Sequence, residues 1–288
     1  MRIAVLITGQ PRYLEEGAWW FKNRVFPESS GVDVDYYGYF WDDGDPNLEN
    51  RIQQTYGPIQ YQIGNYDNAI DQFINSVQER NNKIDDWHNI PEKYKHSFLF
   101  GVEKQYISDY SKQIWGQYLC SDRIANMCGE LNDYDVIIRT RSDVAFNNMP
   151  FKFWHESFAN MYRNPIFNDK MFAPWLYVDS GMPLFADFAF ISKPKVWHNF
   201  NKNIEENCIR LATENKALWY ELGISDFYHV PHWIWNKLAM YSGTSMLSYS
   251  VVWPMPFDCK LFRYNENVQN INFDHINNQF SRFSQEHD

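Results

Sequence analysis

The sequence predicts an α/β protein with three layers, in which helices cover both faces of a mainly parallel central sheet. Short runs rich in β-branched residues alternate with longer stretches of helical periodicity through the first half of the 288 residues. One run, Val136-Ile137-Ile138, is apolar throughout, which is typical of a strand covered on both faces. A long helical stretch leads directly into this run, and strands joined by helices usually run parallel in one sheet.

Helical periodicity is clearest over residues 103–131, where apolar side chains recur every three or four positions and form one face that can pack on a sheet. Further helices are predicted over residues 14–25, 68–80, 197–222 and 233–241. Strands are predicted over residues 2–8, 35–40, 59–63, 136–139 and 185–192. No linker divides the chain, so we expect a single domain over residues 1–288, with an N-terminal half (1–150) and a more elaborate C-terminal half (151–288).

The composition limits the classes of ligand. A formal net charge of −10, with no run of Lys and Arg, argues against nucleic acid as a partner, because binding to a phosphate backbone needs a basic surface. An anionic ligand must then be met by local positive charge or by a metal ion. Aromatic residues make up 18% of the chain, against about a tenth in typical proteins. They can fill a core, and their flat faces can also cover a sugar ring.

The four cysteines and the N-terminus bear on localisation. No two cysteines form a CxxC pair, and Cys120 and Cys128 fall about 12 Å apart on one predicted helix, too far for a disulfide. We therefore expect free thiols in a reducing compartment. The first apolar run is too short for the core of a signal peptide, and no stretch reaches the length of a membrane span. A cytoplasmic protein is expected.

Charged residues follow the 136–139 strand in quick succession: Arg139, Arg141 and Asp143. Ligands of open α/β sheets bind beyond the carboxyl ends of strands, so these side chains are well situated to meet one. Two guanidinium groups suit a diphosphate, and a carboxylate suits a hard divalent cation. The pattern favours a metal-bound phosphorylated ligand, with a nucleotide-sugar as the first candidate. The alternatives are that one arginine pairs with a buried carboxylate and that Asp143 caps the following turn.

The turn after the first strand carries the next candidates. Thr8, Gly9, Gln10 and Arg12 lie where nucleotides are held in Rossmann-like folds. Gly9 permits close approach of the backbone to a ligand, and Arg12 can reach a phosphate or a base.

Four further residues are candidates. Trp41 and Asp42 end the second strand, within reach of a base or ribose in such a fold, and Gln113 on the long helix is a weaker candidate for the same ligand. Asp187 lies in an apolar run, where an unpaired carboxylate is costly to bury. It is a candidate catalytic base for an acceptor hydroxyl or a partner for sugar hydroxyls, the alternative being an internal salt bridge or a cap.

Several of these segments, taken in order, resemble those of polysaccharide-type glycosyltransferases from bacterial and viral surface-glycan clusters. Thr8-Gly9-Gln10-Pro11-Arg12 resembles their "G-Q-x-R" turn, and Phe40-Trp41-Asp42 resembles the end of their second strand. Tyr134-Asp135-Val136-Ile137-Ile138-Arg139-Thr140-Arg141-Ser142-Asp143 resembles their "yD-x-x-I-R-x-R-x-D" signature. Residues 187–192 resemble a later strand, so the resemblance spans residues 2–195.

The resemblance implies a GT-A fold, a Rossmann-like sheet that binds a nucleotide-sugar, usually with Mn²⁺ or Mg²⁺. In such enzymes a DxD motif holds the metal against the diphosphate. Arg141 stands here in place of the first Asp, which leaves Asp143 as the predicted metal ligand and allows Arg141 to neutralise the diphosphate itself.

The resemblance also implies a function. It is that of a hexosyltransferase that moves a sugar from a donor, expected to be a UDP-sugar, to a glycan or another hydroxyl acceptor. Residues 1–150 would hold the nucleotide, and residues 151–288 the acceptor and the sugar. Two other functions are considered: a non-catalytic carbohydrate-binding protein, and a nucleotidyltransferase that acts on sugar phosphates.

Overall fold

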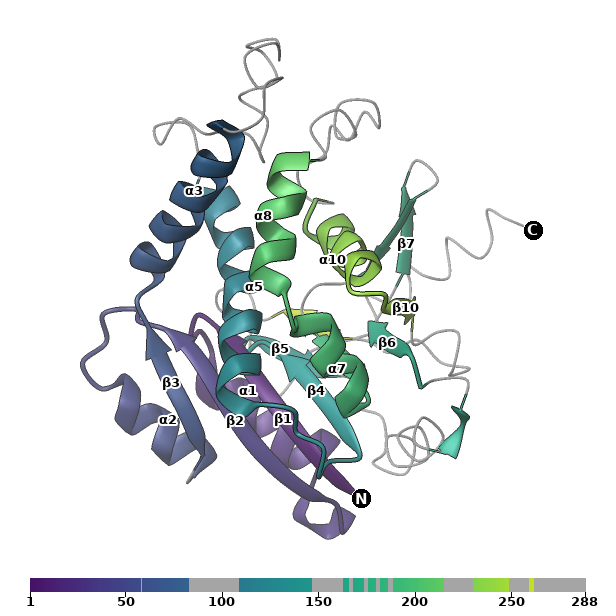
Figure 1. Ribbon diagram of the computed structural model, residues 1–288. Helices are drawn as coiled ribbons and strands as arrows, with labels where there is room; N and C mark the ends of the chain where they lie inside the picture. Colours follow the sequence, from purple (N-terminus) through teal and green to yellow (C-terminus); the bar gives the residue numbers. More distant parts are fainter. Residues whose placement is uncertain are drawn as a thin grey trace.

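The structure of the chain is a computed structural model (Figure 1). It describes residues 1–57, 59–82, 109–146, 163–165, 168–173, 176–179, 182–185, 189–214, 230–248 and 259–261. A seven-stranded sheet lies between two layers of helices, with the strand order β10-β6-β9-β4-β1-β2-β3. The predicted three-layer α/β architecture with a mainly parallel sheet is therefore confirmed.

The sheet draws its strands from both halves of the chain. Their bounds are β1 (Arg2–Gly9), β2 (Asp33–Trp41), β3 (Gln60–Gly64), β4 (Val136–Thr140), β6 (Lys170–Ala173), β9 (Ala189–Ser192) and β10 (Ser245–Ser248). β1 pairs in parallel with both β2 and β4, and β2 pairs in parallel with β3. β9 is antiparallel to β4 and to β6, while β10 is parallel to β6. Of these seven strands, β9 alone runs against the others.

The direction in which strands are added reverses at β1. The chain places β2 and then β3 on one side of β1, and it then crosses to place β4 on the other side. This reversal is a topological switch point, and in open α/β sheets the ligand binds beyond the carboxyl ends of the two strands that meet there.

Side chains of β1 alternate between two apolar cores. Ile3, Val5 and Ile7 belong to one core, and Ala4 and Leu6 belong to the other. All five side chains are buried, which is the pattern of a strand covered on both faces and explains why the run is apolar throughout.

Helices close both cores (Figure 1). The core around Val5 includes residues of α1 (Leu14–Trp20) and α2 (Leu48–Tyr56). The core around Leu6 includes residues of five helices, α3 (Tyr66–Asn82), α5 (Asp109–Cys128), α7 (Pro194–Asn201), α8 (Ile204–Glu214) and α10 (Val230–Tyr241). No described helix is both long and apolar enough to cross a membrane.

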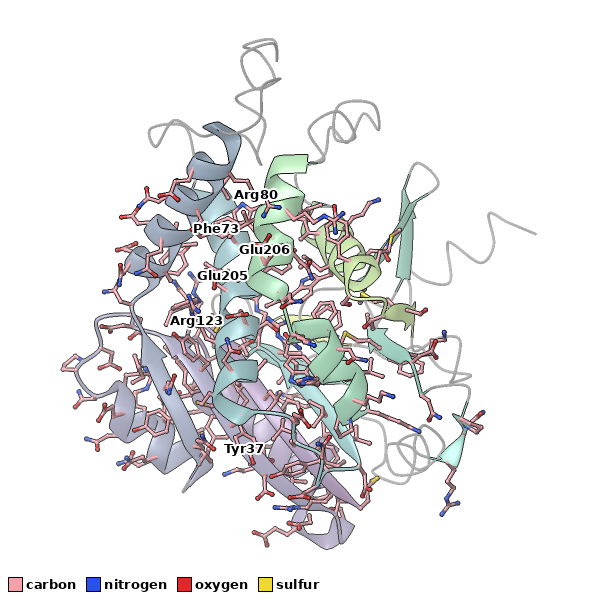
Figure 2. The ribbon with its side chains drawn as sticks, in the orientation of Figure 1. Tyr37, Phe73, Arg80, Arg123, Glu205 and Glu206 are labelled. Atoms are coloured by element: carbon pink, nitrogen blue, oxygen red, sulfur yellow. The ribbon has the colours of Figure 1, made fainter. Side chains whose placement is uncertain are left out.

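Polar contacts tie α3, α5 and α8 together at the surface (Figure 2). Arg80 of α3 pairs with Glu206 of α8, and Arg123 of α5 pairs with Glu205 of α8 at 3.2 Å. Beneath these pairs, Phe73 of α3 packs on Trp115 of α5 with ring centroids 4.8 Å apart. Apolar packing and ion pairs therefore hold the same three helices.

Some elements differ from the prediction. The helix expected at 14–25 ends in a π-helical turn, η1 (Phe21–Val25), and the helix expected from 197 is two helices, α7 and α8. α2 was not predicted, and neither was the 3₁₀ turn η2 (Glu28–Ser30). The helices expected at 68–80 and 233–241 are confirmed as α3 and α10.

The strand expected at 185–192 was too long. Its end is β9, but Phe185 belongs to β8 (Met182–Phe185), which forms a separate two-stranded sheet with β7 (Leu176–Asp179). A second small sheet pairs β5 (Val144–Phe146) with β11 (Cys259–Leu261). Short strands of this kind carry too few residues for a period-two pattern to be read from sequence.

Candidate functional site

The carboxyl ends of β1 and β4 lie side by side at the switch point. Ile7 pairs with Thr140 in the register of these two parallel strands. The buried Thr8 hydroxyl lies 3.5 Å from the Thr140 carbonyl oxygen, so Thr8 connects the two strand ends. The sheet thus brings together two segments that lie more than a hundred residues apart in sequence.

The turn between β1 and α1 is tight. Gly9 has a φ of 111°, outside the range that residues with a Cβ readily adopt. The Arg12 backbone N–H donates to the Gln10 carbonyl at 2.8 Å, and Tyr13, just before α1, has a φ of 52°. Gln10 is half-buried and Arg12 is exposed. The predicted turn residues therefore lie in a fixed loop beside the end of β4.

Cys120 of α5 connects this turn to β2 by two hydrogen bonds, a role that the sequence did not indicate. The Gly9 backbone N–H donates to Cys120 Sγ at 3.0 Å, and the thiol donates to the Tyr39 carbonyl of β2 at 3.1 Å. Burial raises the pKa of the Cys120 thiol to about 12, so it stays protonated and can act as the donor to Tyr39. Cys120, Cys128 and Cys208 are free thiols, as predicted.

Ser142 connects the end of β4 to the same turn, and it too was missed. Its buried hydroxyl lies 2.8 Å from the Arg12 carbonyl oxygen and 3.1 Å from the Gln10 carbonyl oxygen, and it donates its single hydrogen to these two acceptors. The backbone of Ser142 also touches α1, because a Cβ on Gly17 would lie 1.9 Å from the Ser142 carbonyl oxygen. A glycine inside a predicted helix was the sequence signal for this close approach.

Arg141 and Asp143 form a bidentate ion pair. Arg141 Nε donates to Asp143 Oδ1 at 2.8 Å, and Arg141 Nη2 donates to Asp143 Oδ2 at 2.5 Å. The side chain of Asp143 is 9% exposed and that of Arg141 is 21% exposed. Such paired hydrogen bonds fix the plane of the guanidinium and are among the stronger polar contacts in proteins.

This pairing bears on the predicted metal site. Mn²⁺ and Mg²⁺ need about six ligands, mainly oxygens, whereas both oxygens of Asp143 are already engaged by Arg141. Within the described ranges, no group of three or more His, Cys, Asp or Glu side chains is placed to hold a metal ion. The residues that the structure describes therefore do not fit a divalent cation at Asp143.

Arg139 does not accompany Arg141. Its side chain is fully buried, with Cζ 5.2 Å from the ring centroid of Trp235 in α10 and 5.8 Å from that of Phe190 in β9. A straight strand would have placed both arginines on one side, but β4 ends at Thr140 and Arg141 lies in the turn beyond it. Arg139 therefore has no exposed surface with which to touch a ligand in this structure.

Trp41 and Asp42 lie at the end of β2. Trp41 is buried between Tyr39 and Tyr66, and its Nε1 donates to the Gly116 carbonyl at 3.2 Å, so its ring belongs to the core. Asp42 is exposed, and its Oδ1 accepts the Gly44 backbone N–H at 2.9 Å, which makes an Asx turn. Asp42 is therefore at the surface, whereas the Trp41 ring is not placed to stack on a base.

Two candidates cannot be placed with the others. Gln113 belongs to α5, but its side chain is not among those that the structure describes. Asp187 falls outside the described residues, between β8 and β9. The roles given to both stay predictions.

No protein-family model matches the sequence, and no curated protein sequence matches it either. Several solved structures match this chain over most of its length. The apo form of mouse xyloside xylosyltransferase 1 has a TM-score of 0.45 at 8% identity, over 90% of this chain and 95% of that one. An active-site mutant of LgtC has a TM-score of 0.41 at 12% identity, over 83% and 70% of the two chains.

A putative nucleotide-diphospho-sugar transferase from Desulfovibrio desulfuricans has a TM-score of 0.35 at 7% identity, over 86% of this chain and 78% of that one. At these scores and identities the solved structures do not identify the family of this chain.

Proposed function

We propose that this chain is a glycosyltransferase of GT-A type that uses a nucleotide-sugar donor. One observation carries the proposal: the Arg141–Asp143 pair lies directly beside the β1–α1 turn, at the switch point of the sheet, and Ser142 connects the two. Ligands of such sheets bind at this position. A site with an arginine and a glycine turn suits a nucleoside diphosphate group.

The chemistry follows from the leaving group. Glycosyl transfer breaks the bond between the anomeric carbon and the diphosphate, so negative charge gathers on the leaving phosphate in the transition state. A preorganised cation at that place lowers the barrier. Arg141 is suited to this role, because Asp143 fixes the plane of its guanidinium and part of its side chain is exposed.

The β1–α1 turn would hold the rest of the donor. Gly9 allows the backbone to approach the ligand closely, while Gln10 and the exposed Arg12 can reach a phosphate or the base. Asp42, exposed at the end of β2, is suited to a ribose hydroxyl. We propose UDP as the nucleotide and a hexose as the sugar.

The acceptor would be a glycan or a smaller hydroxyl compound. Asp187 is proposed as the base that takes the proton of the attacking hydroxyl, and residues 151–288 are proposed to bind the acceptor. We propose no metal-binding role for Asp143, because both of its carboxylate oxygens accept hydrogen bonds from Arg141.

The test is a panel of nucleotide-sugars offered to the pure protein, with released nucleotide and the melting temperature as readouts. A donor at a hundred times its Kd should stabilise the fold by about 2.7 kcal/mol, or about 4–5 °C for a chain of this size. If no nucleotide-sugar raises the melting temperature at saturation, the proposal fails. Pyrophosphate formed from a nucleoside triphosphate and a sugar phosphate would indicate a nucleotidyltransferase instead. Glycan binding without nucleotide binding would indicate a carbohydrate-binding protein.

A further inference from the structure

The Arg141–Asp143 pair sets two possible ligands against each other. A divalent cation at Asp143 would have to displace the guanidinium from carboxylate oxygens that it holds at 2.8 and 2.5 Å. Arg141 precedes Asp143 by two residues on the same turn, so its positive charge would then lie close to the incoming cation. Like charges at short distance disfavour this arrangement.

An anion meets no such conflict. Arg141 keeps 21% of its side chain exposed while its Nε and Nη2 hold Asp143. A phosphate can therefore approach the exposed part of the group while the pair stays intact. The carboxylate on the other side then acts as a support that keeps the guanidinium in one plane.

The surroundings favour an anion as well. The exposed Arg12 adds a second positive charge, and its carbonyl is tied to the Arg141 segment through Ser142 at 2.8 Å. Two guanidinium groups on neighbouring turns suit an anionic ligand better than a cation.

We infer that this pair is a diphosphate subsite that works without a divalent cation. Arg141 supplies the positive charge that a metal would supply elsewhere, and Asp143 positions Arg141 rather than binding metal. The inference rests on the proposed function for its biological ligand, but the binding of inorganic pyrophosphate tests it separately.

The experiment is isothermal titration calorimetry, which measures the Kd of pyrophosphate for the full chain. It is carried out in EDTA and in Mn²⁺, for wild type and for three variants. In EDTA we expect wild type to bind pyrophosphate, with a Kd within about threefold of that in Mn²⁺. Arg141→Gln should weaken this binding at least tenfold. Lys170→Gln, on the far side of β9 from β4, is the control for loss of one positive charge and should bind like wild type. Blank titrations correct for Mn²⁺ bound by pyrophosphate itself.

Asp143→Asn separates the two roles of Asp143 by whether its effect depends on Mn²⁺. It breaks the bidentate pair that fixes the plane of the Arg141 guanidinium, so pyrophosphate should bind about threefold or more weakly, by the same factor in EDTA and in Mn²⁺. A metal ligand would behave differently: binding would be at least tenfold tighter in Mn²⁺ than in EDTA, and Asp143→Asn would abolish that difference. That result would overturn the inference, as would wild type that binds no pyrophosphate in EDTA. The wild-type comparison decides the matter even if a variant does not fold.

The outcomes also separate this inference from the proposed function. Pyrophosphate binding in EDTA, with no nucleotide-sugar bound or consumed, would keep the subsite and refute the glycosyltransferase. Transfer that requires Mn²⁺ and is lost in Asp143→Asn would keep the glycosyltransferase and refute the metal-free subsite.

Discussion

Gly17→Ala tests whether contact between α1 and the end of β4 fixes the candidate site. The new Cβ would lie 1.9 Å from the Ser142 carbonyl oxygen and 2.9 Å from the Ser142 carbonyl carbon. Both atoms belong to the backbone, so no side chain can turn aside to make room. Either α1 or the Arg141–Asp143 turn must move by about 1 Å to bring the shorter contact to an acceptable distance.

The free energy of unfolding should fall. Overpacking of a buried contact costs about 1–3 kcal/mol or more, and the higher helix propensity of Ala returns at most about 1 kcal/mol. A backbone contact as short as this one belongs at the upper end, so we expect a net loss of about 2 kcal/mol and a fall of about 3–4 °C in the melting temperature. Because Ser142 also holds the β1–α1 turn, the Kd for pyrophosphate or a nucleotide-sugar should rise about tenfold or more.

Gly31→Ala is the matched control. Gly31 has a φ of 64° and nothing within 4 Å of an added Cβ, so the change costs only the left-handed backbone conformation, about 1–2 kcal/mol. It should lower the melting temperature without changing ligand affinity. If Gly17→Ala melts like wild type and binds ligand with wild-type affinity, the contact does not fix the site and the reasoning is wrong.

Variants at three further residues probe single groups. Burial, with a smaller effect of the Glu205 carboxylate, raises the pKa of Asp122 to about 6. Folding therefore takes up a proton, and the free energy of unfolding should fall by about 3 kcal/mol as the pH rises from 4 to 6. Asp122→Asn should remove this fall when urea unfolding is measured against pH, and an unchanged profile would exclude Asp122 as its source. Ser142→Ala should lower the free energy of unfolding by about 1–2 kcal/mol. It should raise the donor KM by a larger factor than it lowers kcat, whereas changes by the same factor would indicate a merely structural effect. Cys120→Ala should cost about 1–3 kcal/mol by leaving the Gly9 N–H without its acceptor, with partial recovery in Cys120→Ser; equal melting temperatures for the two variants would argue against the hydrogen bond.

The layers of the fold could be predicted from sequence because each rests on a local pattern. The run from Ile3 to Ile7 and the run Val136-Ile137-Ile138 are apolar throughout, and both prove to be strands covered on two faces. The period of apolar residues likewise identified α3, α5 and α10. Such patterns are set by burial alone, which a single sequence records well.

What the prediction missed depends on contacts between distant segments. Nothing near Cys120 in sequence indicates that its thiol accepts the Gly9 N–H, because that contact exists only once α5 packs on β1 and β2. Ser142 bonds to carbonyls 130 and 132 residues away. Arg139 and Arg141 differ in the same way: alternation along a strand predicted one common face, but the strand ends between them.

The sequence suggested two roles for Asp143, a metal ligand and a cap of the following turn, and did not indicate its pairing with Arg141. An Asp two residues after an Arg can do any of the three, and only the turn geometry decides among them. Asp187, predicted as the base, lies outside the described residues, so its role depends on experiment.

A crystal structure of the chain with UDP, grown once in EDTA and once in Mn²⁺, would show whether Arg141 or a metal ion meets the diphosphate. We expect a diphosphate beside the β1–α1 turn in both crystals, with a phosphate oxygen within about 3 Å of the Arg141 guanidinium and Asp143 still paired with Arg141. UDP bound away from the carboxyl ends of β1 and β4 would contradict the proposed function. UDP bound there only with Mn²⁺ on Asp143, and with Arg141 turned away, would contradict the metal-free subsite.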